Sequence, residues 1–499
     1  MLFKNTLAQS TGILAGYVFS FLLAPLMISR LGLDKFGVWA VTGAFATYAG
    51  LLDLGVGRSL IRFIAVYEAD GRERRMQECL GLGLIAVTVV GAVALVAVTA
   101  LAPFLSEQIG VLDTDQIRVV LLASVAIFTF NGYQGVFDAL GLGIRRMIPP
   151  NVSTTIGVTV NFTASVIALL LSTSLVVYAL ANVAAAALAM IPSFLAMRYL
   201  WRRPYWSLPS WELVKEVLAY SLKDQVGWIA DLVNFQTDKI VIAFAVDIKA
   251  AAIYEIASRV VMGVRGAAVL TVSAMVPTAA ARIASEGRQV VAEMYSRYTL
   301  RSCGISFPLF VLASVTAPFL LVSWLGEAPG DSELLVPFLT LAYMFNISTA
   351  VGSTIALGAG HPGVVSLNSV IIAILNVLLT LALAPLLGVW GVVGGTFLAL
   401  TLGSVWFTWR FLKLFGLALG SFVSGVLPTA ALALGLAVPP ALLALAVGTP
   451  DGRATAIPLL ALSTLIYAVP YWYLATRFDF LPEKLRFPRA RVAAPEGSA

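Results

Sequence analysis

Residues 79–102 read CLGLGLIAVTVVGAVALVAVTALA, a run of 24 residues without one charged side chain. A transmembrane helix needs about 20 mostly apolar residues, so this run is long enough to cross a bilayer. Fourteen such runs predict an all-α polytopic membrane protein with about fourteen transmembrane helices. The runs cover residues 6–29, 36–57, 79–102, 116–142, 150–171, 174–197, 222–246, 251–280, 303–324, 334–357, 364–386, 391–409, 419–447 and 455–476.

The composition excludes a soluble protein. Of the 499 residues, 60% are apolar and 12% are charged, whereas about a quarter of the residues in soluble domains are charged. A soluble enzyme, a disordered chain and a secreted disulfide scaffold are therefore excluded, and Cys79 and Cys303 are expected to be free thiols. The net charge of +6 is typical of basic cytoplasmic loops that face anionic lipid, so no nucleic-acid partner is expected.

Basic residues gather in alternate loops between the predicted helices. One set of loops holds 24 Lys and Arg and the opposite set holds 5, while Lys239, Arg259 and Arg265 fall inside predicted helices. The positive-inside rule makes the basic loops cytoplasmic. With an even number of helices, both termini are then cytoplasmic, and we expect a multi-pass protein of the cell (cytoplasmic) membrane.

The chain is predicted to form two lobes that repeat one another. Shifting it by 215 positions aligns Asn161 with Asn376 and Arg198 with Lys413, although chance similarity between apolar stretches is an alternative explanation. Lobes of six helices each would be parallel repeats, with the substrate path between them. The predicted parts are an N-terminal lobe (1–200), an amphipathic linker at the membrane interface (201–221), a C-terminal lobe (222–416), and two final helices with a cytoplasmic tail (417–499).

Charged residues within the predicted helices 222–246 and 251–280 are candidates for a functional site. A charge in the membrane costs about 2.5 to 3.5 kcal/mol on insertion scales, so such residues face a cavity or a partner. We interpret the basic ones as lining a water-filled cavity that attracts an anionic head group, and the acidic ones as ion-coupling or charge-pairing groups. The basic residues are Lys239, Arg259 and Arg265, and the acidic residues are Asp231, Asp238 and Glu255.

A structural interpretation of the same charges remains open. With a rise of 1.5 Å per residue, Lys239 and Arg259 lie about 10–12 Å deep, and Asp231 and Arg265 about 21–23 Å deep. Ion pairs could therefore hold one helical hairpin together. The pairs would be Asp231 with Arg265, and Asp238 and Glu255 with Lys239 and Arg259.

Arg58 and Arg62 lie one helical turn apart at the predicted cytoplasmic end of residues 36–57. One hypothesis makes them a docking site for phosphate, to which Arg offers planar bidentate donors. The other is that they, like the following Arg72 to Arg75, only contact anionic lipid.

No residue pattern indicates catalysis or a cofactor. The only histidine, His361, stands in the turn sequence GHPG, and no Cys/His cluster has the spacing of a metal site. The glycines do not form a strand-to-helix phosphate loop. We therefore expect no enzyme activity, no metal and no cofactor.

Three segments resemble the oligosaccharide flippase (polysaccharide biosynthesis protein) family of the multidrug/oligosaccharidyl-lipid/polysaccharide exporter superfamily. They are LLDLGVGR through RF (51–63), TDKI through AIY (237–254), and GAGHP through Asn376 (358–376). The resemblance implies two six-helix lobes around a central cavity, two C-terminal helices, and alternating access that carries a glycan on polyprenyl pyrophosphate to the outer leaflet. It implies cationic cavity residues at Lys239, Arg259, Arg265 and Arg58. The expected partners are a lipid-linked glycan, membrane lipids and other proteins of glycan assembly.

Two other functions compete with this one. A small-molecule or drug antiporter of the same superfamily would be coupled to Na⁺ or H⁺ through Asp231 and Asp238. A membrane-embedded glycosyltransferase or polymerase would generally need a set of acidic or metal-binding residues at a membrane surface and often a sizeable outside loop, and neither is evident in the sequence. The basic cavity residues favour the anionic glycolipid.

Overall fold

The computed structural model describes residues 2–53, 55–201, 206–273, 281–283, 285–287 and 289–481. The side chains of residues 2–14, 52, 53, 58, 223, 224, 270, 271 and 273 lie outside this description. The described residues form helices and connecting segments and include no β-strand. Ten of the described helices are long and apolar enough to cross a membrane. These helices confirm the prediction of an all-α, multi-pass membrane protein.

The chain divides into two compact units. Unit 1 comprises Met1–Arg259 and Ser369–Ala399, and unit 2 comprises Val260–Asn368 and Leu400–Ala499. This division differs from the lobes expected from the sequence, whose limits stay a prediction.

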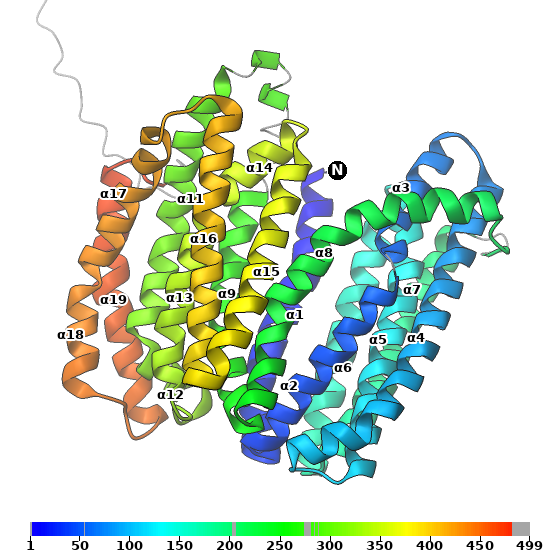
Figure 1. Ribbon diagram of the computed structural model, residues 1–499, viewed down its shortest axis with the longest axis horizontal. Coiled ribbons are helices and arrows are strands. Elements are labelled where there is room, and N and C mark those ends of the chain that lie inside the picture. The colour runs from blue at the N-terminus through cyan, green and yellow to red at the C-terminus, as the bar shows by residue number, and fades with distance from the viewer. Residues whose placement is uncertain are drawn as a thin grey trace, which may run out of the picture. The chain divides into compact units, whose positions relative to one another are not determined.

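The first helices of unit 1 pack as a bundle (Figure 1). Within it, α5 lies against α4 and α7, and α6 lies against α1 and α7. The elements are α1 (Leu2–Leu31), α2 (Leu33–Tyr48), the short 3₁₀ helix η1 (Ala49–Asp53), α3 (Val56–Ala69), α4 (Glu73–Ile109), α5 (Thr114–Gly143), α6 (Ile148–Leu171), α7 (Leu175–Leu200), α8 (Trp211–Ala245) and the first part of α9 (Ile248–Ser273), whose residues from Val260 onward belong to unit 2.

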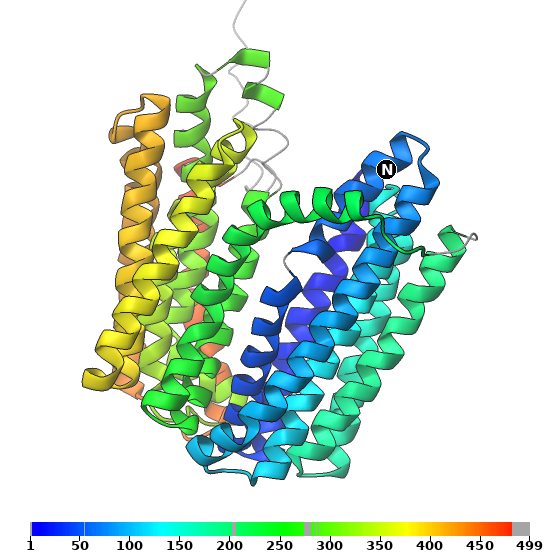
Figure 2. The same cartoon turned by 45° about the vertical axis from the view of Figure 1, so that its right-hand side comes forward.

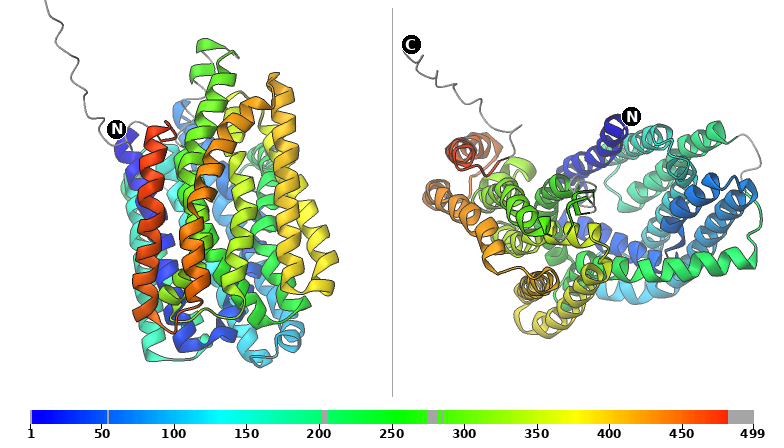
Figure 3. Two further views of the ribbon diagram at one scale, coloured as in Figure 1. Left: turned by 90° about the vertical axis from the view of Figure 1, so that its left-hand side faces the viewer. Right: turned by 90° about the horizontal axis from the view of Figure 1, so that it is seen from above.

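Unit 2 is built around α11, which packs against α13 and α17, while α19 packs against α12 and α17. Figure 3 shows α19 in red next to α17 in orange. The elements are α11 (Val290–Val315), α12 (Ala317–Leu325), α13 (Ser332–Ser348), α14 (Ala350–Gly358), α15 (Pro362–Leu387), α16 (Val389–Phe415), α17 (Gly420–Leu436), α18 (Val438–Val447) and α19 (Arg453–Arg477). Residues of α15 and α16 between Ser369 and Ala399 belong to unit 1.

The predicted run 36–57 is interrupted within the fold. Between α2 and α3 the chain passes through η1 and then Gly55, whose φ of 76° is left-handed. A Cβ at Gly55 would also lie 3.0 Å from Gln225 Oε1 and 3.1 Å from the Ser221 carbonyl oxygen of α8. Only glycine fits this backbone without strain, so the interruption is encoded locally.

One helix, α8, contains most of the predicted helix 222–246 and also the second half of the predicted interfacial linker (201–221). From Trp211 to Ala245 the chain is continuous as α8, and no proline stands between these residues to break it. In Figure 2, α8 (green) first runs across the ends of α3 and α4 and then turns to run beside α2. Trp211 and Leu208 are 68% and 73% exposed, which suits a segment at a membrane interface.

Polar contacts hold the start of α8 against α4. Ser210 caps α8 and donates to Glu78 Oε2 over 2.8 Å. Arg75 contacts the same Glu78 oxygen (3.3 Å), Ser210 Oγ (2.7 Å) and Glu212 Oε2 (2.6 Å). The contacts fix the direction in which α8 enters the bundle of unit 1.

Candidate functional site

One carboxylate lies between two of the predicted cations. Glu255 of α9 accepts a hydrogen bond from Lys239 Nζ of α8 through Oε2 (3.0 Å) and from Arg259 Nε through Oε1 (2.9 Å). All three side chains are largely buried. The ion-pair interpretation is therefore confirmed for Glu255 with Lys239 and Arg259, and the cluster has a net positive charge.

Asp238 has different partners from those expected. Its Oδ2 accepts hydrogen bonds from the Tyr254 hydroxyl (2.6 Å) and from Thr396 Oγ1 (2.8 Å), and Asn376 Nδ2 donates to the same Thr396 hydroxyl (3.4 Å). Among the described residues Asp238 has no salt bridge, so its predicted pairing with Lys239 or Arg259 is wrong. The physical reason is helical geometry, because consecutive residues point about 100° apart, so that Lys239 meets Glu255 while Asp238 meets the hydroxyls of Tyr254 and Thr396.

The other predicted residues lie elsewhere. Asp231 is exposed on α8 of unit 1, and Arg265 is half-buried on α9 in unit 2, so their proposed pairing stays a prediction. Arg62 is exposed on α3, with its guanidinium carbon 4.0 Å from the centre of the Tyr220 ring of α8. The side chain of Arg58 lies outside the described residues.

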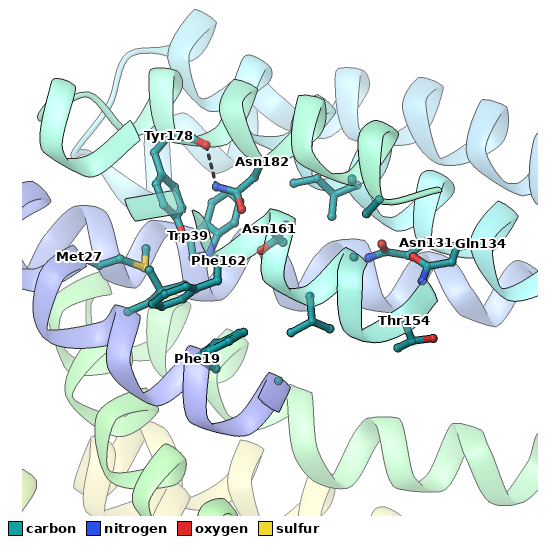
Figure 4. Close-up of a pocket in the computed structure, with 18 of the residues that line it drawn as sticks. Phe19, Met27, Trp39, Asn131, Gln134, Thr154, Asn161, Phe162, Tyr178 and Asn182 are labelled. Atoms are coloured by element: carbon teal, nitrogen blue, oxygen red, sulfur yellow. Dashed lines mark hydrogen bonds between the residues drawn. The ribbon is translucent and has the colours of Figure 1, made fainter. Parts of the chain in front are cut away.

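Unit 1 contains a cavity of about 420 Å³, which we call the amide cavity. In Figure 4, Trp39, Tyr178 and Phe162 gather at one end and Asn131, Gln134 and Thr154 at the other, with Asn161 between them. Its volume is within the range of about 300–1,000 Å³ of small-molecule sites. Helices α1, α2, α5, α6 and α7 supply most of the wall, and α9 contributes Arg259.

Arg259 is the one charged residue among the described residues that line the amide cavity. Its Nη1 donates to the carbonyl oxygen (3.1 Å) and the hydroxyl (3.3 Å) of Ser20 in α1, and its guanidinium carbon lies 5.1 Å from the centre of the Phe36 ring. The hydrogen bonds that it makes with described residues use Nε and Nη1. The donors of Nη2 thus remain for an anionic ligand.

The amides of the cavity fall into two groups. Asn182 is occupied within the protein, since it donates to the Tyr178 carbonyl oxygen and accepts from Ser165 Oγ, both over 2.9 Å. Asn131 and Asn161 make no hydrogen bond with a described residue and line the cavity. Their donors and acceptors can bind a ligand that carries hydroxyl groups.

Sequence reasoning missed these amides, although a signal was present. Asn131 and Gln134 stand three residues apart in an apolar run, which places them on one face of a helix.

A second cavity of about 470 Å³ lies between helices of unit 1, and Asp138, Gln225 and Trp228 contribute to its wall. Asp138 was also missed. It is the one acidic residue in the predicted helix 116–142. A single carboxylate in an apolar helix is the signal that could have identified it as a candidate.

The fold is similar to the folds of a lipid II flippase and of multidrug transporters. The lipid II flippase MurJ in an inward closed conformation has a TM-score of 0.69 at 13% identity, covering 94% of this chain and 99% of that chain. An inward-facing multidrug resistance MATE family transporter has a TM-score of 0.65 at 17% identity, covering 80% and 95%. An outward-facing MATE transporter has a TM-score of 0.53 at 17% identity, covering 82% and 96%.

The sequence identifies the family to which the chain belongs. Residues 2–283 match the family described as polysaccharide biosynthesis protein. The chain belongs to this family, and the resemblance found in its sequence is confirmed. No curated protein matches the chain.

Proposed function

We propose that the chain is a flippase that carries a lipid-linked oligosaccharide, a glycan on polyprenyl pyrophosphate, across the cytoplasmic membrane by alternating access. The observation that carries the proposal is Arg259, a cation held by Glu255 in the wall of a cavity whose other described lining residues are uncharged. A guanidinium binds phosphate through two parallel hydrogen bonds, and free amides bind sugar hydroxyls. Membership of the polysaccharide biosynthesis family and a fold like that of a lipid II flippase support this substrate class.

The proposed membrane arrangement has fourteen crossings. Four of them are interrupted helices, namely α2 with η1 and α3, α11 with α12, α13 with α14, and α17 with α18. The excess of Lys and Arg in alternate loops supports cytoplasmic termini. Two parallel six-helix repeats, followed by two helices, complete the arrangement that we propose.

The remaining charged residues have proposed roles around this site. Lys239 shares Glu255 with Arg259 and so limits how strongly the carboxylate neutralises the guanidinium. Arg265, Arg58 and Arg62 would add positive charge along the path of the head group. Asp231, Asp238 and Glu255 would couple transport to an ion or balance charge.

The proposal is tested with proteoliposomes that contain a polyprenyl-pyrophosphate oligosaccharide in both leaflets. The wild type and Arg259→Gln are compared at equal protein levels. We expect the variant to translocate at least about tenfold more slowly, because a hydrogen bond to a charged group contributes about 1.5–3 kcal/mol. The matched control is Arg118→Gln, which removes an arginine that pairs with the exposed Asp115 (2.8 Å) on α5.

An ion-coupled antiporter for small molecules is the second candidate. It is favoured by the buried Asp238 and by the fold that the chain shares with multidrug transporters. If the wild type moved no glycolipid but exported organic cations against a Na⁺ or H⁺ gradient, this function would replace the flippase. The amide cavity argues against it, because no described residue of its lining is acidic.

A further inference from the structure

The second cavity of unit 1 is long and largely apolar. Along α5 its wall runs from Phe128 to Leu142, which corresponds to about 21 Å at a rise of 1.5 Å per residue. Ile61 of α3 and Val87 of α4 supply further apolar wall. A volume of about 470 Å³ along this length is narrow, so the space has the shape of an extended hydrocarbon chain and not of a compact ring system.

The polar groups of this wall have partners within the protein. Gln225 Nε2 of α8 donates to the Leu51 carbonyl oxygen over 3.4 Å. The Asp138 carboxylate is hydrogen-bonded to side chains of α5, α6 and α7. A water molecule in a cavity needs two to four polar partners, and apolar cavities hold no water. The described wall therefore favours an apolar occupant.

A lipid chain is the apolar ligand that matches the length of the cavity. Both α4 and α5 are long and apolar enough to cross a membrane. The hydrocarbon core of a bilayer is about 30 Å thick, so a chain of one leaflet reaches about 15 Å. Phe128 and Trp228 meet at the end opposite Leu142, where a Cβ at Gly50 would lie 2.7 Å from the Trp228 ring and 3.2 Å from the Phe128 ring. A bound chain would thus end at these rings and have its head group near Leu142.

Cations stand at the head-group end of the cavity. The turn after α5 follows Leu142 directly and carries Arg145 and Arg146, both exposed. Neither side chain makes a hydrogen bond or a salt bridge with a described residue. The φ of Arg145 is 62°, a left-handed conformation that is unfavourable for a residue with a Cβ. The turn keeps an arginine at this strained position, next to the end of an apolar cavity.

Arg62 of α3 adds a third guanidinium at this level. It follows Ile61 of the cavity wall, and a Cβ at Gly143 would lie 3.1 Å from the Ile61 carbonyl oxygen, so α3 and the end of α5 are in contact here. The Arg62 guanidinium carbon lies 4.0 Å from the centre of the Tyr220 ring, and its N–H groups make no hydrogen bond with a described residue. Stacking on the ring orients the guanidinium and leaves the donors at its edge for a phosphate.

We propose that the second cavity binds one acyl chain of an anionic glycerophospholipid, whose phosphate contacts Arg62, Arg145 and Arg146. The cavity supplies the apolar surface for the chain, and the three arginines supply the attraction for an anionic head group. A bound chain would fill the space between α3, α4, α5 and α8. The site is separate from Arg259 and does not depend on the flippase proposal, because lipid binding can be measured without transport.

The test reconstitutes the full chain into phosphatidylcholine bilayers with rising fractions of phosphatidylglycerol that carries bromine near the chain end. Bromine quenches tryptophan fluorescence on contact, and the signal of Trp228 is the difference between the wild type and Trp228→Phe. We expect quenching that saturates and that unlabelled phosphatidylglycerol reverses. Gly135→Leu should abolish it, because Gly135 lines the cavity and a Cβ there meets no atom within 4 Å. Gly43→Leu, which enters open space outside this cavity, should be quenched as the wild type is.

A second pair of variants tests the head-group end. Arg145→Gly suits the left-handed backbone while it removes the guanidinium; combined with Arg62→Gln, it should raise the half-saturating fraction of phosphatidylglycerol at least about threefold. The matched control is Arg74→Gln, which removes an arginine that is 89% exposed and lies 3.5 Å from Glu78.

Three results would overturn the proposal. Brominated phosphatidylcholine could quench Trp228 as strongly as brominated phosphatidylglycerol, which would remove the head group from the site. Quenching could survive Gly135→Leu, which would place the chain outside the cavity. Polyprenyl phosphate could reverse the quenching at a lower fraction than phosphatidylglycerol, which would assign the site, and with it Arg62, to the lipid of the proposed substrate.

Discussion

At the residue scale, Glu255 is the group on which the candidate site depends. It accepts from both Lys239 and Arg259, and its side chain is 13% exposed. A buried carboxylate that serves two cations positions Arg259 as well as neutralising part of its charge. Removing its charge therefore tests stability and site geometry together.

Glu255→Gln should destabilise the folded protein strongly. Removing one partner of a buried ion pair costs about 3–5 kcal/mol, because the other charge is left uncompensated. The measurement is Tm in detergent, compared with Asp115→Asn, whose carboxylate is 87% exposed and pairs with Arg118. An exposed pair contributes about 0–1 kcal/mol, so equal losses of Tm in the two variants would contradict the buried triad.

At the element scale, the direction of α8 depends on how closely residues 206–210 approach α4. Ser207 donates its backbone N–H to the Gln77 carbonyl oxygen over 3.2 Å. A Cβ at Gly81 would overlap the Ser207 carbonyl oxygen. The close approach requires glycine at this position, and the capping contacts of Ser210 follow from it.

Gly81→Ala should detach this segment from α4. Since backbone atoms block the new methyl group, either the segment or α4 must move, and we expect faster proteolysis around residue 207 and a change in Trp206 and Trp211 fluorescence. The control is Gly43→Ala, where a Cβ meets nothing within 4 Å. Unchanged cleavage in Gly81→Ala would mean that the segment does not depend on this contact.

At the scale of the whole molecule, the amide cavity can be filled by a larger side chain at a lining position where no neighbouring atom stands in its way. Gly16 of α1 lines it, and a Cβ at Gly16 meets no atom within 4 Å. We expect Gly16→Leu to fold normally and to reduce glycolipid translocation in proteoliposomes by at least about tenfold, because the side chain takes the volume of the substrate. Gly43→Leu, which also enters open space but not the cavity, should translocate as the wild type does. Normal translocation by a folded Gly16→Leu would remove the cavity from the transport path.

The sequence by itself determined the class of protein and much of its helix content. The length and apolarity of runs such as 79–102 are local properties, and α4 (Glu73–Ile109) contains that run entirely. The spacing of Glu255 and Arg259 is also local, because residues four apart face each other on any α-helix. The family resemblance rested likewise on short contiguous segments.

Only the tertiary structure decided which polar groups share a site. Arg259 reaches Ser20 across 239 residues of chain, and Asp238 reaches Thr396 across 158. Asp138 and Ser193 come together only because α5 packs against α7. Helical periodicity predicts which face of a helix a residue occupies but not which helix covers that face, and this choice depends on packing between elements far apart in sequence.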